Sequence, residues 1–126
     1  MTVNEFRRLV LALTGAEEGA HMGHPDFRVG GRVFASLHGT PLHGMAKVSP
    51  HDQARLIETC PDVFEPEAGA WGRAGCTRVR LEQATTEEVG EALTLAWQRA
   101  IAQGPTRPKA RRTAPRGKAA AVRTRR

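Results

Sequence analysis

The amino-acid sequence predicts a small α+β protein with two layers, an antiparallel sheet and helices packed on one of its faces. Three observations lead to this prediction. In two segments, about residues 3–13 and 89–101, apolar residues recur at three- and four-residue steps, which is typical of amphipathic helices. Short alternating runs lie between them, and glycine and proline separate these runs as they separate strands. The expected order is helix, strands, helix, hairpin, helix.

The first element is expected to be a helix from about Val3 to Leu13. Thr2 and Glu5 have the spacing of a capping box, in which each side chain satisfies a free backbone N–H of the other residue. The apolar residues form a single stripe that must face a core. Thr14 and Gly15 end the helix.

In the next segment, residues 19–48, short runs separated by glycine and proline predict strands. The runs 27–29 and 32–37 flank Gly30-Gly31, and a Gly-Gly pair is typical of a tight hairpin turn because its residues adopt positive φ easily. Residues 42–48 are expected to form a further strand. Ser49 as N-cap and Pro50 at the first helical position then predict a second helix, which runs to about Thr59.

A second hairpin is expected over residues 70–81, with Trp71-Gly72 leading into it. Alternation in its last strand places Thr77 and Val79 on a buried face, and Arg78 and Arg80 on the opposite face. The final helix begins at a second capping box, Thr85 with Glu88, and its apolar stripe includes Trp97 as a core residue. Gly104 and Pro105 terminate it.

The positive charge of the chain is concentrated at its C-terminal end. The net charge is +6, but residues 105–126 contain nine of the 19 basic residues and no acidic residue. The ten remaining basic residues stand against 13 acidic ones, which gives residues 1–104 a net charge of −3. The tail has almost no large apolar residue, so it cannot bury enough surface to offset the entropy of ordering. We expect one folded domain, 1–104, and a disordered basic tail, 105–126.

Composition also limits the class of protein. No signal peptide and no run of about 20 apolar residues is present, so a membrane-bound protein is not expected. With only two cysteines, Cys60 and Cys76, reduced thiols in the cytoplasm are a better expectation than a disulfide framework.

Several motifs resemble those of the MmcQ/YjbR family. They are Gly23-His24-Pro25-Asp26-Phe27 with the hairpin that follows, Lys47, the segment 61–66, Trp71-Gly72-Arg73, and Thr77 to Leu81. The resemblance spans about residues 6–102. It implies a two-layer α+β fold called CyaY-like, and DNA binding through a double-wing arrangement of hairpins.

The residues themselves suggest where DNA would bind. Two hairpins could present cations on the open sheet face and its edges, where guanidinium groups bind phosphates bidentately. The expected residues of the folded domain are Arg28, Arg32, Lys47, Arg73, Arg78 and Arg80. Those expected in the tail are Arg107, Lys109, Arg111, Arg112, Arg116 and Lys118. Trp71 is a candidate for stacking on a base, although a buried indole at the sheet edge is the commoner role.

An alternative reading pairs the hairpin arginines with Glu65, Glu67 or Glu82 across the sheet. A cationic patch broken in this way would favour the rival function, a protein-binding or small-ligand-binding module that uses the open sheet face. The tail would then be incidental, serving solubility or general attraction to RNA.

Neither a cofactor nor catalysis is expected. A metal site can be drawn from His21, His24, Asp26, His38 and His43, but their spacing matches no familiar metal-binding motif. Cys76 has no base near it in the sequence, and we expect it to pack as a small apolar side chain. The sequence therefore predicts a binding protein that is not an enzyme.

Overall fold

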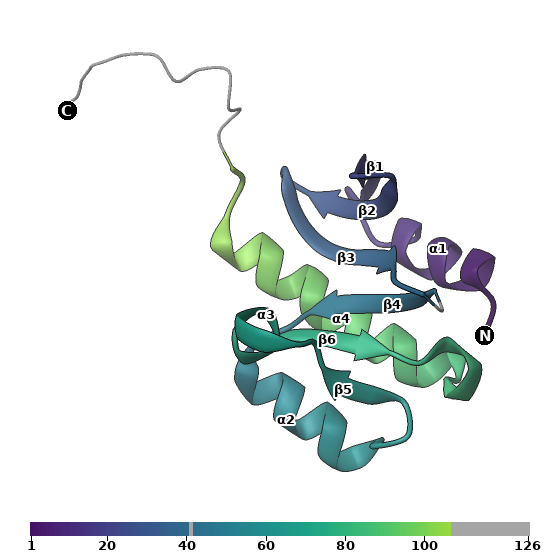
Figure 1. The fold of residues 1–126 in the computed structure, drawn as a ribbon. Helices are drawn as coiled ribbons and strands as arrows, with labels where there is room; N and C mark the ends of the chain where they lie inside the picture. Colours follow the sequence, from purple (N-terminus) through teal and green to yellow (C-terminus); the bar gives the residue numbers. More distant parts are fainter. Residues whose placement is uncertain (41, 107–126) are drawn as a thin grey trace, which may run out of the picture.

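The computed structural model describes residues 1–40 and 42–106, apart from the side chain of His21. In these residues six strands form one antiparallel sheet in the order β1-β2-β3-β4-β6-β5 (Figure 1). The strands are β1 (Glu17–His21), β2 (His24–Val29), β3 (Arg32–His38), β4 (His43–Lys47), β5 (Phe64–Pro66) and β6 (Cys76–Val79). The helices are α1 (Val3–Leu11), α2 (Pro50–Thr59), α3 (Gly69–Arg73) and α4 (Thr86–Gln103), with a short 3₁₀ turn at Leu81–Gln83.

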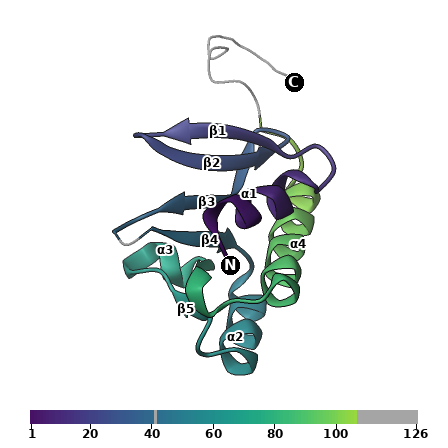
Figure 2. The same ribbon diagram turned by 90° about the vertical axis from the view of Figure 1, so that its right-hand side faces the viewer.

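The predicted two-layer α+β architecture is confirmed. Helices α1 and α4 cover one face of the sheet, and the β1–β2 hairpin and α3 project on the opposite side (Figure 2). A row of paired residues faces the helices, and all of them are buried: Phe27, Ala35, Ala46 and Thr77. The rings of Phe6 and Phe27 meet at a centroid distance of 6.3 Å, which joins α1 to the sheet.

The helix starts agree with the predicted caps. Thr2 with Glu5, and Thr85 with Glu88, both form complete capping boxes, and the Ser49 side chain accepts a hydrogen bond from the Asp52 backbone N–H. Each cap satisfies backbone donors that have no partner within the helix. The last helix ends before Gly104, as expected.

The predicted hairpin around Gly30-Gly31 is also confirmed, because both glycines have positive φ, at 60° and 81°, and join β2 to β3. A bulge interrupts the pairing between Phe27 and Arg28. Trp97, expected in the core, is only partly buried, and its indole N–H donates to the Thr14 carbonyl at 2.8 Å.

The predicted second hairpin is wrong in its first half. Residues 69–73 form the short helix α3, and β6 pairs instead with β4 and β5. Gly72 is the reason that α3 can sit so close to β5: a Cβ at this position would lie only 1.9 Å from the Glu67 carbonyl oxygen. Strands β1 and β5 were not predicted, since neither has a strong alternating pattern.

None of the helices within the described part of the chain is both long and apolar enough to cross a membrane.

Candidate nucleic-acid interface

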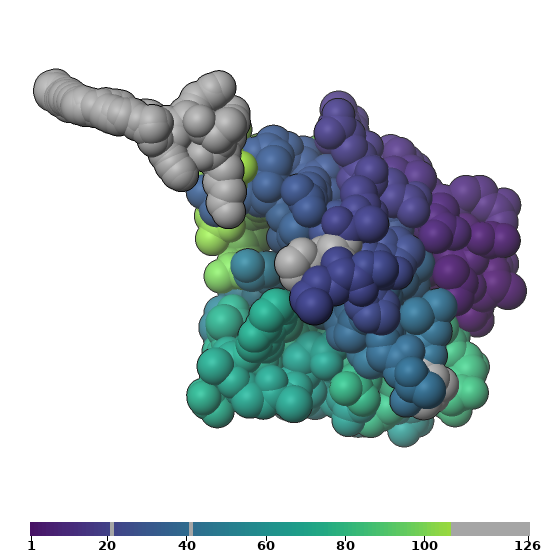
Figure 3. All heavy atoms as spheres, turned by 45° about the horizontal axis from the view of Figure 1, so that its top comes forward, coloured from purple at the N-terminus to yellow at the C-terminus, as the bar shows by residue number. Residues whose placement is uncertain are grey.

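The sheet face opposite α1 and α4 carries both polar and apolar side chains. One row of paired residues crosses this face from strand to strand: Asp26, Ser36, Met45, Arg78 and Glu65. A groove of about 850 Å³ opens on it between the start of β2 and α3. Figure 3 shows the teal segment that contains α3 beside the dark-blue β1–β2 hairpin, which borders the groove.

The groove is lined mainly by apolar groups. Its lining includes Pro25, Val33, Met45, Ala70, Trp71, Ala74 and Cys76. Met45 and Cys76 are buried, whereas Trp71 is 69% exposed. Trp71 therefore does not cap the sheet edge; α3 holds it at the mouth of the groove with its ring open to solvent.

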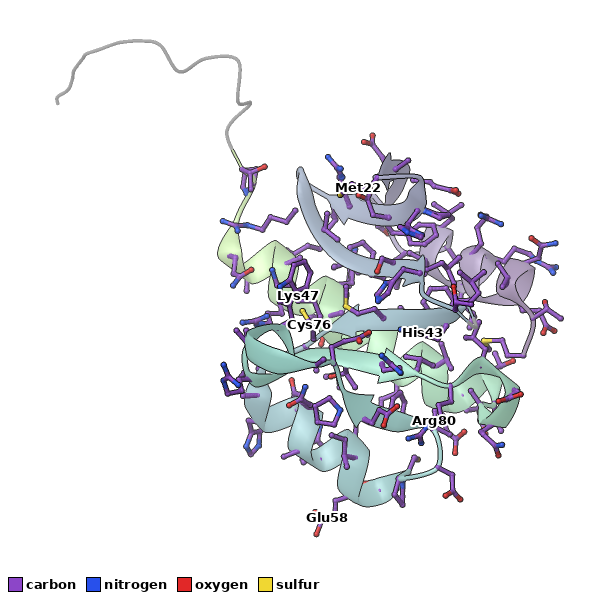
Figure 4. All side chains as sticks on the ribbon, in the orientation of Figure 1. Met22, His43, Lys47, Glu58, Cys76 and Arg80 are labelled. Atoms are coloured by element: carbon purple, nitrogen blue, oxygen red, sulfur yellow. The ribbon has the colours of Figure 1, made fainter. Side chains whose placement is uncertain are left out.

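Of the predicted phosphate-binding cations, Lys47 lies beside Trp71, and Arg73 is on the same helix as Trp71 but outside the groove lining. Lys47 lines the groove and is exposed at the end of β4, next to Cys76 on β6 (Figure 4). Arg73 is exposed on α3 itself. Neither forms an ion pair with any residue that the structure describes.

Arg28 also lines the groove, but its guanidinium group already forms an ion pair with a neighbouring carboxylate. Its guanidinium donates to both carboxylate oxygens of Asp26, at 3.1 and 3.0 Å, and this contact raises the Arg28 pKa. Only 6% of the Asp26 side chain is exposed, against 42% for Arg28. A buried carboxylate needs such a partner, so the main role of Arg28 visible here is to neutralise Asp26.

Arg78 and Arg80 are paired with glutamates. Arg78 contacts Glu67 at 3.2 Å and Glu65 at 3.7 Å, and Arg80 contacts Glu65 at 2.8 Å. Arg80 also donates to the carbonyls of residues 61 and 62. Two of the three glutamates expected to break the cationic patch do so, and Glu82 makes no ion pair with a described arginine.

Arg32 lies away from the groove. Its guanidinium donates to the carbonyls of Gln103 and Gly104, so it holds the C-terminal end of α4 against the β2–β3 hairpin. The structure thus brings Arg28, Lys47 and Trp71 together and separates them from Arg32. The predicted tail residues, Arg107, Lys109, Arg111, Arg112, Arg116 and Lys118, lie outside the described residues.

A cluster of two histidines and one glutamate lies next to the groove on the same face. The Nε2 atoms of His38 and His43 are each 3.2 Å from Oε2 of Glu67, and the two rings meet at a centroid distance of 4.5 Å. Burial lowers the pKa of His38. Glu67 was absent from the candidate metal ligands drawn from the sequence, because it is 24 residues away from His43 and no spacing motif links them.

Two other residues of that candidate set, His24 and Asp26, do not join this cluster, and the side chain of His21 lies outside the described part of the structure. Asp26 is bound to Arg28, and the His24 ring lies 6.5 Å from the His38 ring. Cys76 is buried, and burial raises the pKa of its thiol, which agrees with its expected role as a packed apolar side chain.

Comparison with known proteins finds a matching family and a similar solved structure. A model of the YjbR family matches residues 11–99. The crystal structure of Deinococcus radiodurans protein DR2400, which has a DUF419 domain, is similar with a TM-score of 0.67 and 23% identity, covering 86% of this chain and 83% of that one. This likeness concerns the fold alone. No curated protein matches the chain.

Proposed function

Because the chain belongs to the YjbR family, we propose that it is a non-enzymatic DNA-binding module that holds unpaired DNA. An exposed base enters the groove on the open sheet face and stacks on Trp71, while Lys47, Arg73 and the basic tail contact phosphates. The observation that carries this proposal is the 69% exposed Trp71 at the mouth of an apolar groove, with the exposed Lys47 beside it.

The groove suits a flat and largely apolar group. Its volume of about 850 Å³ lies within the range of about 300–1,000 Å³ that is usual for ligand pockets. Stacking of a base on an aromatic side chain contributes about 1–3 kcal/mol and tolerates any base, because every base has a π-face. Sequence preference is therefore expected to be weak.

Duplex DNA is a poorer fit to the folded domain. The guanidinium groups of Arg28, Arg78 and Arg80 are already paired with carboxylates, and Arg32 binds the end of α4. A phosphate would have to replace these internal contacts, which costs free energy. The net charge of −3 on residues 1–104 further weakens attraction to a double strand with its high density of phosphates.

In this proposal the tail attracts nucleic acid electrostatically and does not distinguish one sequence from another. Its nine cations can each neutralise a phosphate, and each neutralised phosphate contributes a slope of about −0.7 for single strands in log K against log salt. We expect the tail to raise affinity for any nucleic acid and the groove to favour single strands.

Fluorescence anisotropy with labelled single-stranded and double-stranded 20-mers, over a range of salt concentrations, tests the proposal. The full chain is compared with a version that ends at Thr106, which keeps the hydrogen bond of Thr106 to Gly30. Trp71→Ala is expected to weaken binding of single strands by about 5-fold to 150-fold, the equivalent of 1–3 kcal/mol. Ile101→Ala, which also removes an exposed apolar side chain but from α4, is the matched control.

The rival function is a protein-binding or small-ligand-binding module that uses the same groove. The pairing of Arg78 and Arg80 with Glu65 and Glu67 favours it, because the arginines then form no continuous cationic patch. Binding only by the full chain, unchanged by Trp71→Ala and equal for single and double strands, would assign DNA affinity to the tail. The groove would then serve the rival function.

A further inference from the structure

The cluster of His38, His43 and Glu67 brings three potential metal-ligand atoms close together. One ligand atom of each residue lies within 4.8 Å of the other two, and the Nε2 atoms of both histidines are 3.2 Å from Oε2 of Glu67. Ligand atoms around a tetrahedral Zn²⁺ ion stand about 3.3 Å apart, given Zn–N and Zn–O bonds of about 2.0–2.2 Å. The spacing therefore approaches that of a metal site before any side chain moves.

Neighbouring residues hold the ligands in this orientation. Arg78 donates to Oε1 of Glu67 at 3.2 Å, which leaves Oε2 to face the histidines. Ser36 Oγ lies 3.1 Å from Nδ1 of His38. A serine hydroxyl can donate or accept, so it can serve either tautomer of His38. Outer contacts of this kind orient the ring of a ligating histidine in metal sites.

The cluster is accessible from solvent. A hollow of about 690 Å³ borders all three residues and is also lined by Leu42, Glu65 and Arg80. Of the positive charges that face it, those on Arg78 and Arg80 are paired with Glu65 and Glu67, and the amino group of Met1 donates to the Leu81 carbonyl. A cation can thus reach the cluster from the hollow.

We propose that His38, His43 and Glu67 bind a divalent transition-metal ion, with Zn²⁺ as the best fit, and leave a fourth position for water or an anionic ligand. Two imidazoles and a carboxylate with an open position form a known type of zinc site. The same donor set suits Fe²⁺, which is the second metal to test. On binding, His38 changes from the Nε2–H to the Nδ1–H tautomer, and Ser36 becomes the acceptor.

Titration calorimetry of the reduced full chain with Zn²⁺ is the primary test, and one ion per chain is expected. The tail contains no histidine, cysteine or acidic residue and cannot compete. His43→Asn and Glu67→Gln should each weaken binding more than about 100-fold, beyond the 10–100-fold typical of outer-shell changes, and Ser36→Ala should fall in that smaller range. His51→Asn, an exposed histidine on α2, is the matched control and should change nothing.

Two measurements on the unmodified protein keep the test independent of whether the variants fold. Long-range ¹H–¹⁵N spectra should show Zn²⁺ shifting Nε2 of His38 and His43, with the proton of His38 moving to Nδ1. Co²⁺ should give the visible bands of a four-coordinate site without a thiolate charge-transfer band. Absence of binding, shifts at His24 or His51 instead, or a thiolate band from Cys60 or Cys76 would overturn the proposal.

Discussion

The two glutamates that pair with Arg78 are expected to differ strongly in their contribution to stability. Glu67 has only 10% of its side chain exposed and contacts Arg78, His38 and His43, whereas Glu65 is 36% exposed. Glu67→Ala removes one charge-assisted hydrogen bond of about 1.5–3 kcal/mol and two further bonds of about 1 kcal/mol each. Because Arg78 is 38% exposed and can recover some hydration, we expect a loss of about 3 kcal/mol. Glu65→Ala, as an exposed pair, should cost about 0.5 kcal/mol.

Urea unfolding of metal-free protein, followed by circular dichroism, measures both effects. With a slope of about 1.5 kcal/mol/M, the midpoint should fall by about 2 M for Glu67→Ala and by about 0.3 M for Glu65→Ala. Equal shifts for the two variants would refute the argument that burial decides the value of these ion pairs. A loss below about 1 kcal/mol for Glu67→Ala would show that the His38–His43–Glu67 cluster contributes little to the fold.

Four further predictions concern residues on both faces of the sheet. Gly72→Ala should cost about 1–3 kcal/mol and alter the tryptophan emission, because its Cβ would meet a backbone carbonyl just after β5 at 1.9 Å. Gly90→Ala, a helical glycine with open space, should instead stabilise by about 0.5–1 kcal/mol. Arg28→Ala should lower thermal stability by about 1–3 kcal/mol because it leaves the Asp26 carboxylate unpaired, and adding Asp26→Asn should restore much of the loss. The pKa of Glu88 is lowered by its capping hydrogen bond, so its stabilisation is complete above the ordinary value of 4.5 and is lost as pH falls through the lower folded-state pKa. Glu88→Gln should therefore reduce the acid sensitivity of unfolding without abolishing the cap.

Local signals in the sequence were sufficient to predict many of the helices and turns. The capping residues Thr2 and Thr85, the Ser49-Pro50 helix start and the Gly30-Gly31 turn act over a few residues, so each can be recognised without knowledge of the rest of the chain. The apolar stripes of α1 and α4 likewise require a common core, which predicted the helical layer.

The segment around Trp71 shows where such reasoning fails. Glycine and an aromatic residue before an alternating run suggested a hairpin, but a five-residue helix has too few positions to show periodicity. Its location depends on the close approach of Gly72 to the Glu67 carbonyl, and the helix joins two strands, β5 and β6, that pair with each other. The exposure of Trp71 on this helix was not visible in the sequence pattern.

By itself, the sequence determined the fold class, the family resemblance, the main helices and the division of charge between domain and tail, because composition, capping and periodicity are properties of short segments. Only the tertiary structure decided which arginines are already paired, that an open groove lies beside Trp71, and that His38 and His43 meet Glu67. These features depend on strand register. Pairing across a sheet brings residues together, and the distance between them along the chain does not indicate that they will meet.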